Sequence, residues 1–164
     1  MIRVEVFYKW RNRLKSVIFI SMKDDALLCV GQKALIEKDG KILVLNDPFE
    51  GLDFPGGKIQ EDEAKDGDAS SLIRSLQREV KEETNLEIEV GDPFASWYHE
   101  FFKVPKTNEN YGKVVYYVAF KCRYISGELK LSDEHDKFMW VDKNNYKEVD
   151  NGSDYFKVLE KYFR

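Results

Sequence analysis

Glu79, Glu82 and Glu83 are the residues of this sequence best suited to chemistry, because their spacing gathers three carboxylates on one predicted helix. Acids at i, i+3 and i+4 repel one another, and the C-terminal half of a helix disfavours negative charge. A divalent cation would relieve both penalties, and carboxylate oxygens suit Mg²⁺ or Mn²⁺. The alternative interpretation is an ordinary solvated charged face.

The helix that positions these acids is predicted over residues 72–84, which contain no Gly or Pro. Ser70 or Ser71 is the expected N-cap, and Asn85 the expected stop. At about 100° per residue, Glu83 falls inside the apolar stripe and Glu79 at its edge. That stripe consists of Leu72, Ile73, Leu76 and Val80. A carboxylate on a core-facing stripe is costly unless its charge is compensated, which favours the metal interpretation.

The segment 57–86 resembles the Nudix box, whose pattern is G-x5-E-x7-R-E-U-x-E-E-x-G-U, with U a bulky aliphatic residue. The matching residues are Gly57, Glu63, Arg78, Glu79, Val80, Glu82, Glu83 and Leu86, after a typical Phe54-Pro55-Gly56 lead-in. The resemblance implies an α/β fold, a Nudix-type α/β/α sandwich with a mixed β-sheet.

The sequence departs from the box pattern in two places. Asn85 stands where the pattern has its last glycine, and Asn can serve the same backbone role. Arg78 follows Gly57 by 21 positions (78 − 57), where the pattern has 14, so seven extra residues lie within 62–70. If the pattern is aligned from Gly57 in the loop, Glu63 is the first box glutamate. If the pattern is aligned from Arg78 in the helix, the position of that glutamate falls on Ser70, with Asp68 nearby.

The resemblance also implies roles for individual residues. Glu79, Glu82 and Glu83 are expected to hold Mg²⁺ or Mn²⁺, with Glu63 and Gly57 as further candidates. Either Glu83 or Glu134 is expected to take the proton from water, with Glu79 as a further catalytic candidate. A solvated acidic turn is the alternative interpretation for Glu134.

Four residues are candidates for substrate binding. Phe54 and Trp97 could stack on a base, although aromatic residues more often belong to the core. Lys58 could contact phosphate. Arg78 could contact substrate or, through charge-assisted hydrogen bonds, orient the glutamates.

The composition indicates one globular domain of 164 residues, 43% hydrophobic and 34% charged. The net charge of −4 argues against membrane binding or nucleic-acid binding through bulk charge. Cys29 and Cys122 form no metal or redox spacing, so reduced thiols and a cytoplasmic protein are expected. No apolar run is long enough to span a bilayer.

Residues 1–28 form a predicted extension, and residues 29–164 the predicted Nudix domain. The extension could be a β-hairpin that extends the sheet or supports a homodimer, or a solvated arm. Later segments also predict elements: strands at 30–37, 41–45, 86–90, 113–123 and 138–141, an extended stretch at 95–104, and a closing helix at 153–163 capped by Ser153.

The predicted activity is hydrolysis of a nucleoside diphosphate linked to another group. A nucleoside triphosphate is the first expected substrate, and an ADP-ribose-like compound the second. One alternative is a non-catalytic Nudix-like domain that senses a nucleotide. A weaker alternative is isomerisation of an isoprenoid diphosphate on the same fold.

Overall fold

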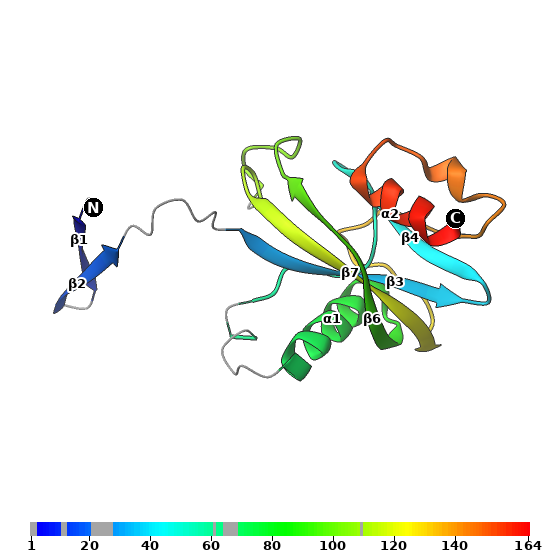
Figure 1. Ribbon diagram of the computed structural model, residues 1–164, viewed down its shortest axis with the longest axis horizontal. Helices are drawn as coiled ribbons and strands as arrows, with labels where there is room; N and C mark the ends of the chain where they lie inside the picture. Colours follow the sequence, from blue (N-terminus) through cyan, green and yellow to red (C-terminus); the bar gives the residue numbers. More distant parts are fainter. Residues whose placement is uncertain (1–2, 11–12, 21–27, 61, 64–68, 109) are drawn as a thin grey trace.

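A six-stranded mixed sheet forms the centre of the protein (Figure 1), seen in a computed structural model. The structure describes residues 3–10, 13–20, 28–60, 62–63, 69–108 and 110–164. The strand order is β5-β4-β3-β7-β6, with β8 paired to β4. Strands β3 and β7 run parallel, and the other pairs are antiparallel. The bounds are β3 Cys29–Lys38, β4 Lys41–Asp47, β5 Gly51–Asp53, β6 Glu87–Glu100, β7 Val114–Ser126 and β8 Lys137–Val141.

Helices cover both faces of this sheet. Successive residues of a strand point to opposite faces, so one strand packs against both helix layers. In β3, Leu35 packs into the cluster that contains Phe156 and Leu159 of α2 (Asp154–Phe163). Its neighbour Ile36 packs instead into the cluster that contains Leu76 of α1 (Ala69–Thr84). The two layers of helix around the sheet confirm the α/β/α sandwich.

The turn at Asp39 and Gly40, with φ of 53° and 75°, joins β3 to β4 as a tight hairpin. Most predicted elements are present, with three differences. Strand β5 and the short 3-10 helix η1 (Tyr146–Val149) were not predicted. Strand β6 is one continuous strand with register shifts, where two segments were expected. Its bulges keep it paired to β7 through Pro93.

Helix α1 carries the predicted acids but begins earlier than expected. It starts at Ala69, so Ser70 and Ser71 lie in its first turn and the predicted serine cap is wrong. Asn85 ends it with φ of 59°, as the pattern required. Within the apolar stripe, Leu76 and Val80 are buried, while Ile73 is 42% exposed and does not belong to the core.

Ser153 caps α2 as predicted, since its side chain accepts a hydrogen bond from the Phe156 N–H. Replacing Ser153 with Ala is expected to cost about 1 kcal/mol and to lower Tm by about 2–4 °C. Thermal unfolding followed by circular dichroism measures the change. Ser126→Ala, at an exposed end of β7, is the control and is expected to leave Tm nearly unchanged. Equal Tm values for the two variants would contradict the capping role.

The N-terminal strands β1 (Arg3–Trp10) and β2 (Arg13–Ile20) pair with each other in an antiparallel ladder. They form a two-stranded sheet of their own, so this hairpin does not extend the main sheet as one hypothesis required. The division of the chain into an extension and a domain stays a prediction. Among the described residues, no helix is both long and apolar enough to cross a membrane.

Candidate active site

The glycine turn before α1 is fixed to β3 by backbone hydrogen bonds. Ala34 N–H donates to the Pro55 carbonyl at 2.7 Å, and Gln32 N–H donates to the Gly57 carbonyl at 2.8 Å. Gly56 adopts φ of +127°, and a Cβ there would lie 2.3 Å from the Gln32 carbonyl oxygen. Only glycine fits this conformation and this approach. The turn therefore holds a fixed position against the C-terminal half of α1.

Glu83 is the buried carboxylate of the site. The residue is 6% exposed, and its Oε2 accepts a hydrogen bond from the Gly56 N–H at 2.8 Å. Burial raises the pKa of Glu83 to about 7; the Lys33 ammonium opposes this rise and the Asp53 carboxylate adds to it. The position of Glu83 inside the apolar stripe, inferred from helical periodicity, matches this burial.

Arg78 connects three carboxylates. Its guanidinium contacts Glu79 and Glu82 at 2.7 Å each and Glu63 at 2.8 Å. These contacts raise the pKa of Arg78 despite its partial burial. These contacts are those of a residue that orients the glutamates, one of the two roles expected for Arg78, and the role itself stays a prediction.

Glu63 has the position of the first box glutamate. Its carboxylate accepts hydrogen bonds from the Gln60 N–H, the Ser75 hydroxyl and Arg78. Ser70, the alternative, lies in the first turn of α1 and accepts from Arg74, and Asp68 lies outside the described residues. Because these donors occupy Glu63, and because it does not line the cavity, the structure favours an anchoring role over the expected metal-ligand role.

A second charged group, not predicted from the sequence, lies beside the glutamates. Lys33 from β3 is buried, and its Nζ lies 2.9 Å from Asp53 Oδ2 and 2.8 Å from the Gly56 carbonyl oxygen. Burial lowers the pKa of Lys33, but the Asp53 carboxylate outweighs it and the net shift is upward. His135 Nε2 lies 3.5 Å from Asp53. The sequence feature that could have identified Lys33 is the presence of a lysine within a mostly apolar predicted strand.

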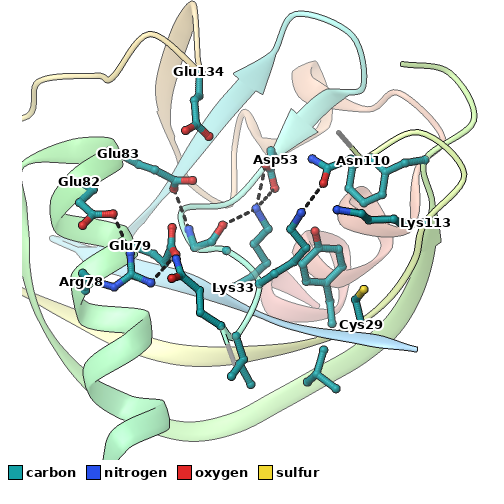
Figure 2. A pocket seen from close by; sticks show the side chains of 18 of the residues that line it. Cys29, Lys33, Asp53, Arg78, Glu79, Glu82, Glu83, Asn110, Lys113 and Glu134 are labelled. Carbon is teal, nitrogen blue, oxygen red and sulfur yellow. Dashed lines mark hydrogen bonds and ion pairs between the residues drawn. The ribbon is translucent and has the colours of Figure 1, made fainter. Parts of the chain in front are cut away.

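One cavity of about 1180 Å³ joins these groups (Figure 2), and it is large enough for a nucleotide. Glu79, Glu82 and Glu83 line it from α1. Figure 2 shows Glu134, from the loop before β8, directed into the cavity on the side of Glu83. Lys58, held by Asn110, lines another part of the wall.

Two predicted substrate contacts lie in the core instead. Phe54 is fully buried and packs against Tyr155 at 6.0 Å between ring centroids. Trp97 is 9% exposed and packs against Tyr117 and Tyr155. Neither lines the cavity, so the stacking role predicted for them is not supported. Two other aromatic residues, Phe101 and Tyr117, line the cavity, and neither was predicted as a substrate contact.

The residues present fit a divalent cation. Their ligand atoms are carboxylate oxygens. Burial raises the pKa of Glu83 more than the Lys33 ammonium lowers it, so the negative charge of Glu83 is only partly balanced by the described residues. Within the described part of the chain, no three Asp, Glu, His or Cys side chains already form a metal-binding group. In this arrangement Arg78 contacts Glu79 and Glu82, while the Gly56 N–H holds Glu83. Glu79, Glu82 and Glu83 would hold the cation after release from these contacts.

Gly57 provides the space for Glu79, while its own carbonyl oxygen faces β3. A Cβ on Gly57 would lie 2.6 Å from the Glu79 carboxyl group. Gly57→Ala is therefore expected to displace this side chain and to lower kcat by about 10²-fold. Steady-state kinetics test the loss, and an unchanged Tm shows that the fold is kept. Full activity in Gly57→Ala would contradict this positioning of Glu79.

The comparisons with known proteins agree with this geometry. The family model of the NUDIX domain matches residues 28–162. The MutT protein from Methanosarcina mazei Go1 shares 25% identity and a TM-score of 0.62, covering 82% of this chain and 94% of that chain. The E. coli ORF135 protein has 24% identity and a TM-score of 0.61, covering 82% and 88%.

A third solved structure is an ADP-ribose pyrophosphatase from Streptococcus suis 89-1591. It shares 22% identity and a TM-score of 0.54, covering 84% of this chain and 93% of that chain. No curated protein sequence matches this chain. With the box glutamates gathered at one cavity and the family model covering most of the sequence, the chain belongs to the NUDIX domain family and is a hydrolase acting on phosphoric anhydride bonds.

Proposed function

We propose that this protein is a divalent-metal-dependent pyrophosphohydrolase that cleaves a nucleoside diphosphate linked to another group. The observation that carries the proposal is the Glu83 carboxylate, buried at the cavity wall beside Glu79 with its pKa raised to about 7. Such a carboxylate is costly without a cation, and the cavity can hold a nucleotide. A nucleoside triphosphate is the first proposed substrate and an ADP-ribose-like compound the second, in line with the MutT and ADP-ribose pyrophosphatase relatives.

Glu79, Glu82 and Glu83 are the proposed ligands of Mg²⁺ or Mn²⁺. When bound, such ions neutralise the diphosphate and activate water. Arg78 keeps the carboxylates aligned on α1. Glu134 enters the cavity from a separate loop, so it and Glu83 are the two candidates for accepting the proton from water.

Two carboxylate variants separate these roles. A residue that only accepts the proton is recognised by a Gln variant that loses turnover and keeps Mn²⁺ affinity. A metal ligand is recognised by the loss of both. Comparing Glu83→Gln with Glu134→Gln by kinetics and Mn²⁺ titration therefore assigns the two residues.

On the other part of the cavity wall, Lys58, Asn110 and Lys113 are the proposed contacts for the remainder of the nucleotide. Amide and ammonium groups there offer hydrogen bonds to phosphate or sugar oxygens. The two free cysteines support the proposed cytoplasmic location. A homodimer through the N-terminal hairpin stays a proposal.

A substrate panel tests the activity. The purified protein is incubated with Mg²⁺ or Mn²⁺ and with nucleoside triphosphates, oxidised nucleoside triphosphates, ADP-ribose, nucleotide sugars and dinucleoside polyphosphates. Chromatography identifies the products, and chelator-treated protein is the blank. A nucleoside monophosphate product that depends on metal supports the proposal and identifies the substrate class. No product from any compound, with nucleotide binding retained, would contradict it.

A further inference from the structure

The charges that line the cavity are divided between two walls. Figure 2 shows Asn110 and Lys113 on the side of the cavity opposite Glu79, Glu82 and Glu83. The acidic wall on α1 is the proposed site of the metal ions, which bind the diphosphate that is cleaved. The opposite wall faces the part of the substrate that lies farthest from these ions.

Lys113 is a cation of the cavity that lacks a counterion. The residue is half-buried, and among the described residues its ammonium group has no ion pair and no hydrogen bond. Two other cations of the cavity are balanced, since Lys33 pairs with Asp53 and Arg78 contacts carboxylates of α1. A partly buried ammonium is costly unless its charge is compensated. An anionic group of the substrate would compensate it.

Backbone hydrogen bonds hold Lys113 in place on this wall. The residue lies directly before β7, and its carbonyl oxygen accepts from the Phe101 N–H at 3.0 Å. Its own N–H donates to the Asn110 carbonyl at 2.9 Å. These bonds close the segment between β6 and β7, so Asn110 and Lys113 line the cavity together.

The side chain of Asn110 adds a hydrogen-bond donor to the same wall. Its Oδ1 accepts from the Lys58 ammonium, which can only donate. The Nδ2 amide group of Asn110 is therefore the part that can meet a substrate. Together with the lysines it makes a wall of donors that carries positive charge. Phosphate oxygens are charged acceptors and match this wall, whereas an uncharged sugar hydroxyl gains less from it.

We propose that Lys113 and Asn110 bind the terminal phosphate of the substrate and thereby select nucleoside triphosphates over ADP-ribose-like compounds. The proposal rests on the hydrolysis proposed above and narrows it to one of the two substrate classes. A terminal phosphate carries a charge of about −1.5 to −2 at neutral pH, whereas ADP-ribose ends in an uncharged sugar. The two classes thus differ in the group that this wall contacts.

Kinetics with a matched pair of nucleotides tests the proposal. A nucleoside triphosphate and the diphosphate of the same base share the bond between the α- and β-phosphates and differ only by the third phosphate. Lys113→Met is expected to lower kcat/KM for the triphosphate by about 10- to 100-fold, the effect of losing a charge-assisted hydrogen bond. Its kcat/KM for the diphosphate and for ADP-ribose is expected to change little. Lys113→Arg retains the charge and is expected to keep most of the triphosphate preference.

Lys103→Met is the matched control for this variant. Lys103 belongs to the same segment but is exposed and does not line the cavity, so its loss removes one positive charge and leaves the wall intact. The control is expected to keep wild-type kcat/KM for every substrate. A Lys113→Met protein that keeps the wild-type ratio of triphosphate to diphosphate kcat/KM would overturn the proposal. Equal losses on the triphosphate and on ADP-ribose would do the same.

A binding measurement tests the proposal without turnover. Nucleotide analogues with a methylene group between the α- and β-phosphates cannot be cleaved there, and calorimetry in Mg²⁺ gives their affinities. The wild type is expected to bind the triphosphate analogue about tenfold more tightly than the diphosphate analogue, and Lys113→Met is expected to abolish this difference. Equal affinities in the wild type would overturn the proposal. An inactive substrate panel would defeat the proposed hydrolysis but leave the affinities interpretable, so the two failures are distinguishable.

Discussion

Replacing Glu83 with Gln is expected to lower kcat/KM by about 10²- to 10⁴-fold on whichever substrate the panel identifies. Gln has nearly the same shape and can still accept the hydrogen bond from the Gly56 N–H. The variant therefore removes the negative charge and the basic oxygen with little change in packing. Both proposed roles of Glu83, metal ligand and proton acceptor, need that charge.

Glu87→Gln is the matched control for this variant. Glu87 follows α1 closely, but its side chain is 56% exposed and pairs with Lys81 outside the cavity. Exposed ion pairs contribute little, so this variant is expected to keep wild-type kcat/KM. Steady-state kinetics with saturating Mg²⁺ make the comparison. Similar rates for Glu83→Gln and wild type would remove Glu83 from the mechanism.

The same substitution is expected to stabilise the metal-free protein at neutral and alkaline pH. The pKa of Glu83 is about 7 in the folded state against an ordinary value of 4.5. Between these values the folded state binds more protons than the unfolded state, so the stability of the wild type falls as pH rises. Glu83→Gln does not titrate. Its advantage over the wild type should therefore grow by roughly 2–3 kcal/mol between pH 5 and pH 8.

Urea unfolding at both pH values, in the presence of a chelator, measures this change. The cost of burying the new amide does not depend on pH, so it cancels in the comparison. Glu87→Gln again serves as the control and is expected to show no comparable growth. A constant free-energy difference between Glu83→Gln and wild type would show that Glu83 does not carry its charge at a cost in the folded state.

Helical periodicity predicted the part of the site that lies on α1. Counting residues along one helix placed Glu83 on the buried side and Glu79 at its edge, since both positions depend only on local geometry. Periodicity failed at Ile73, because the sheet covers only part of the stripe and this side chain reaches solvent.

The other half of the site depends on contacts between distant parts of the chain. Lys33 and Asp53 are 20 positions apart, and only the sheet brings them together. Phe54 was expected near the substrate because an aromatic ring could stack on a base. Its ring packs instead against Tyr155 of α2 within a buried cluster and does not line the cavity. The spacing alone did not show whether Glu63 holds the first glutamate position of the box, because of the additional loop residues. Its ion pair with Arg78 favours that assignment.

The contacts of Arg78 influence how the protein discriminates among ions. A divalent ion that recruits Glu79 and Glu82 must compete with one guanidinium that already contacts both carboxylates. The free energy needed to release these contacts is the same for every ion, so it weakens all affinities by a common factor. The ranking among ions then depends on the carboxylates alone. A substitution at Arg78 would therefore shift the threshold concentration of metal without changing which metal is preferred.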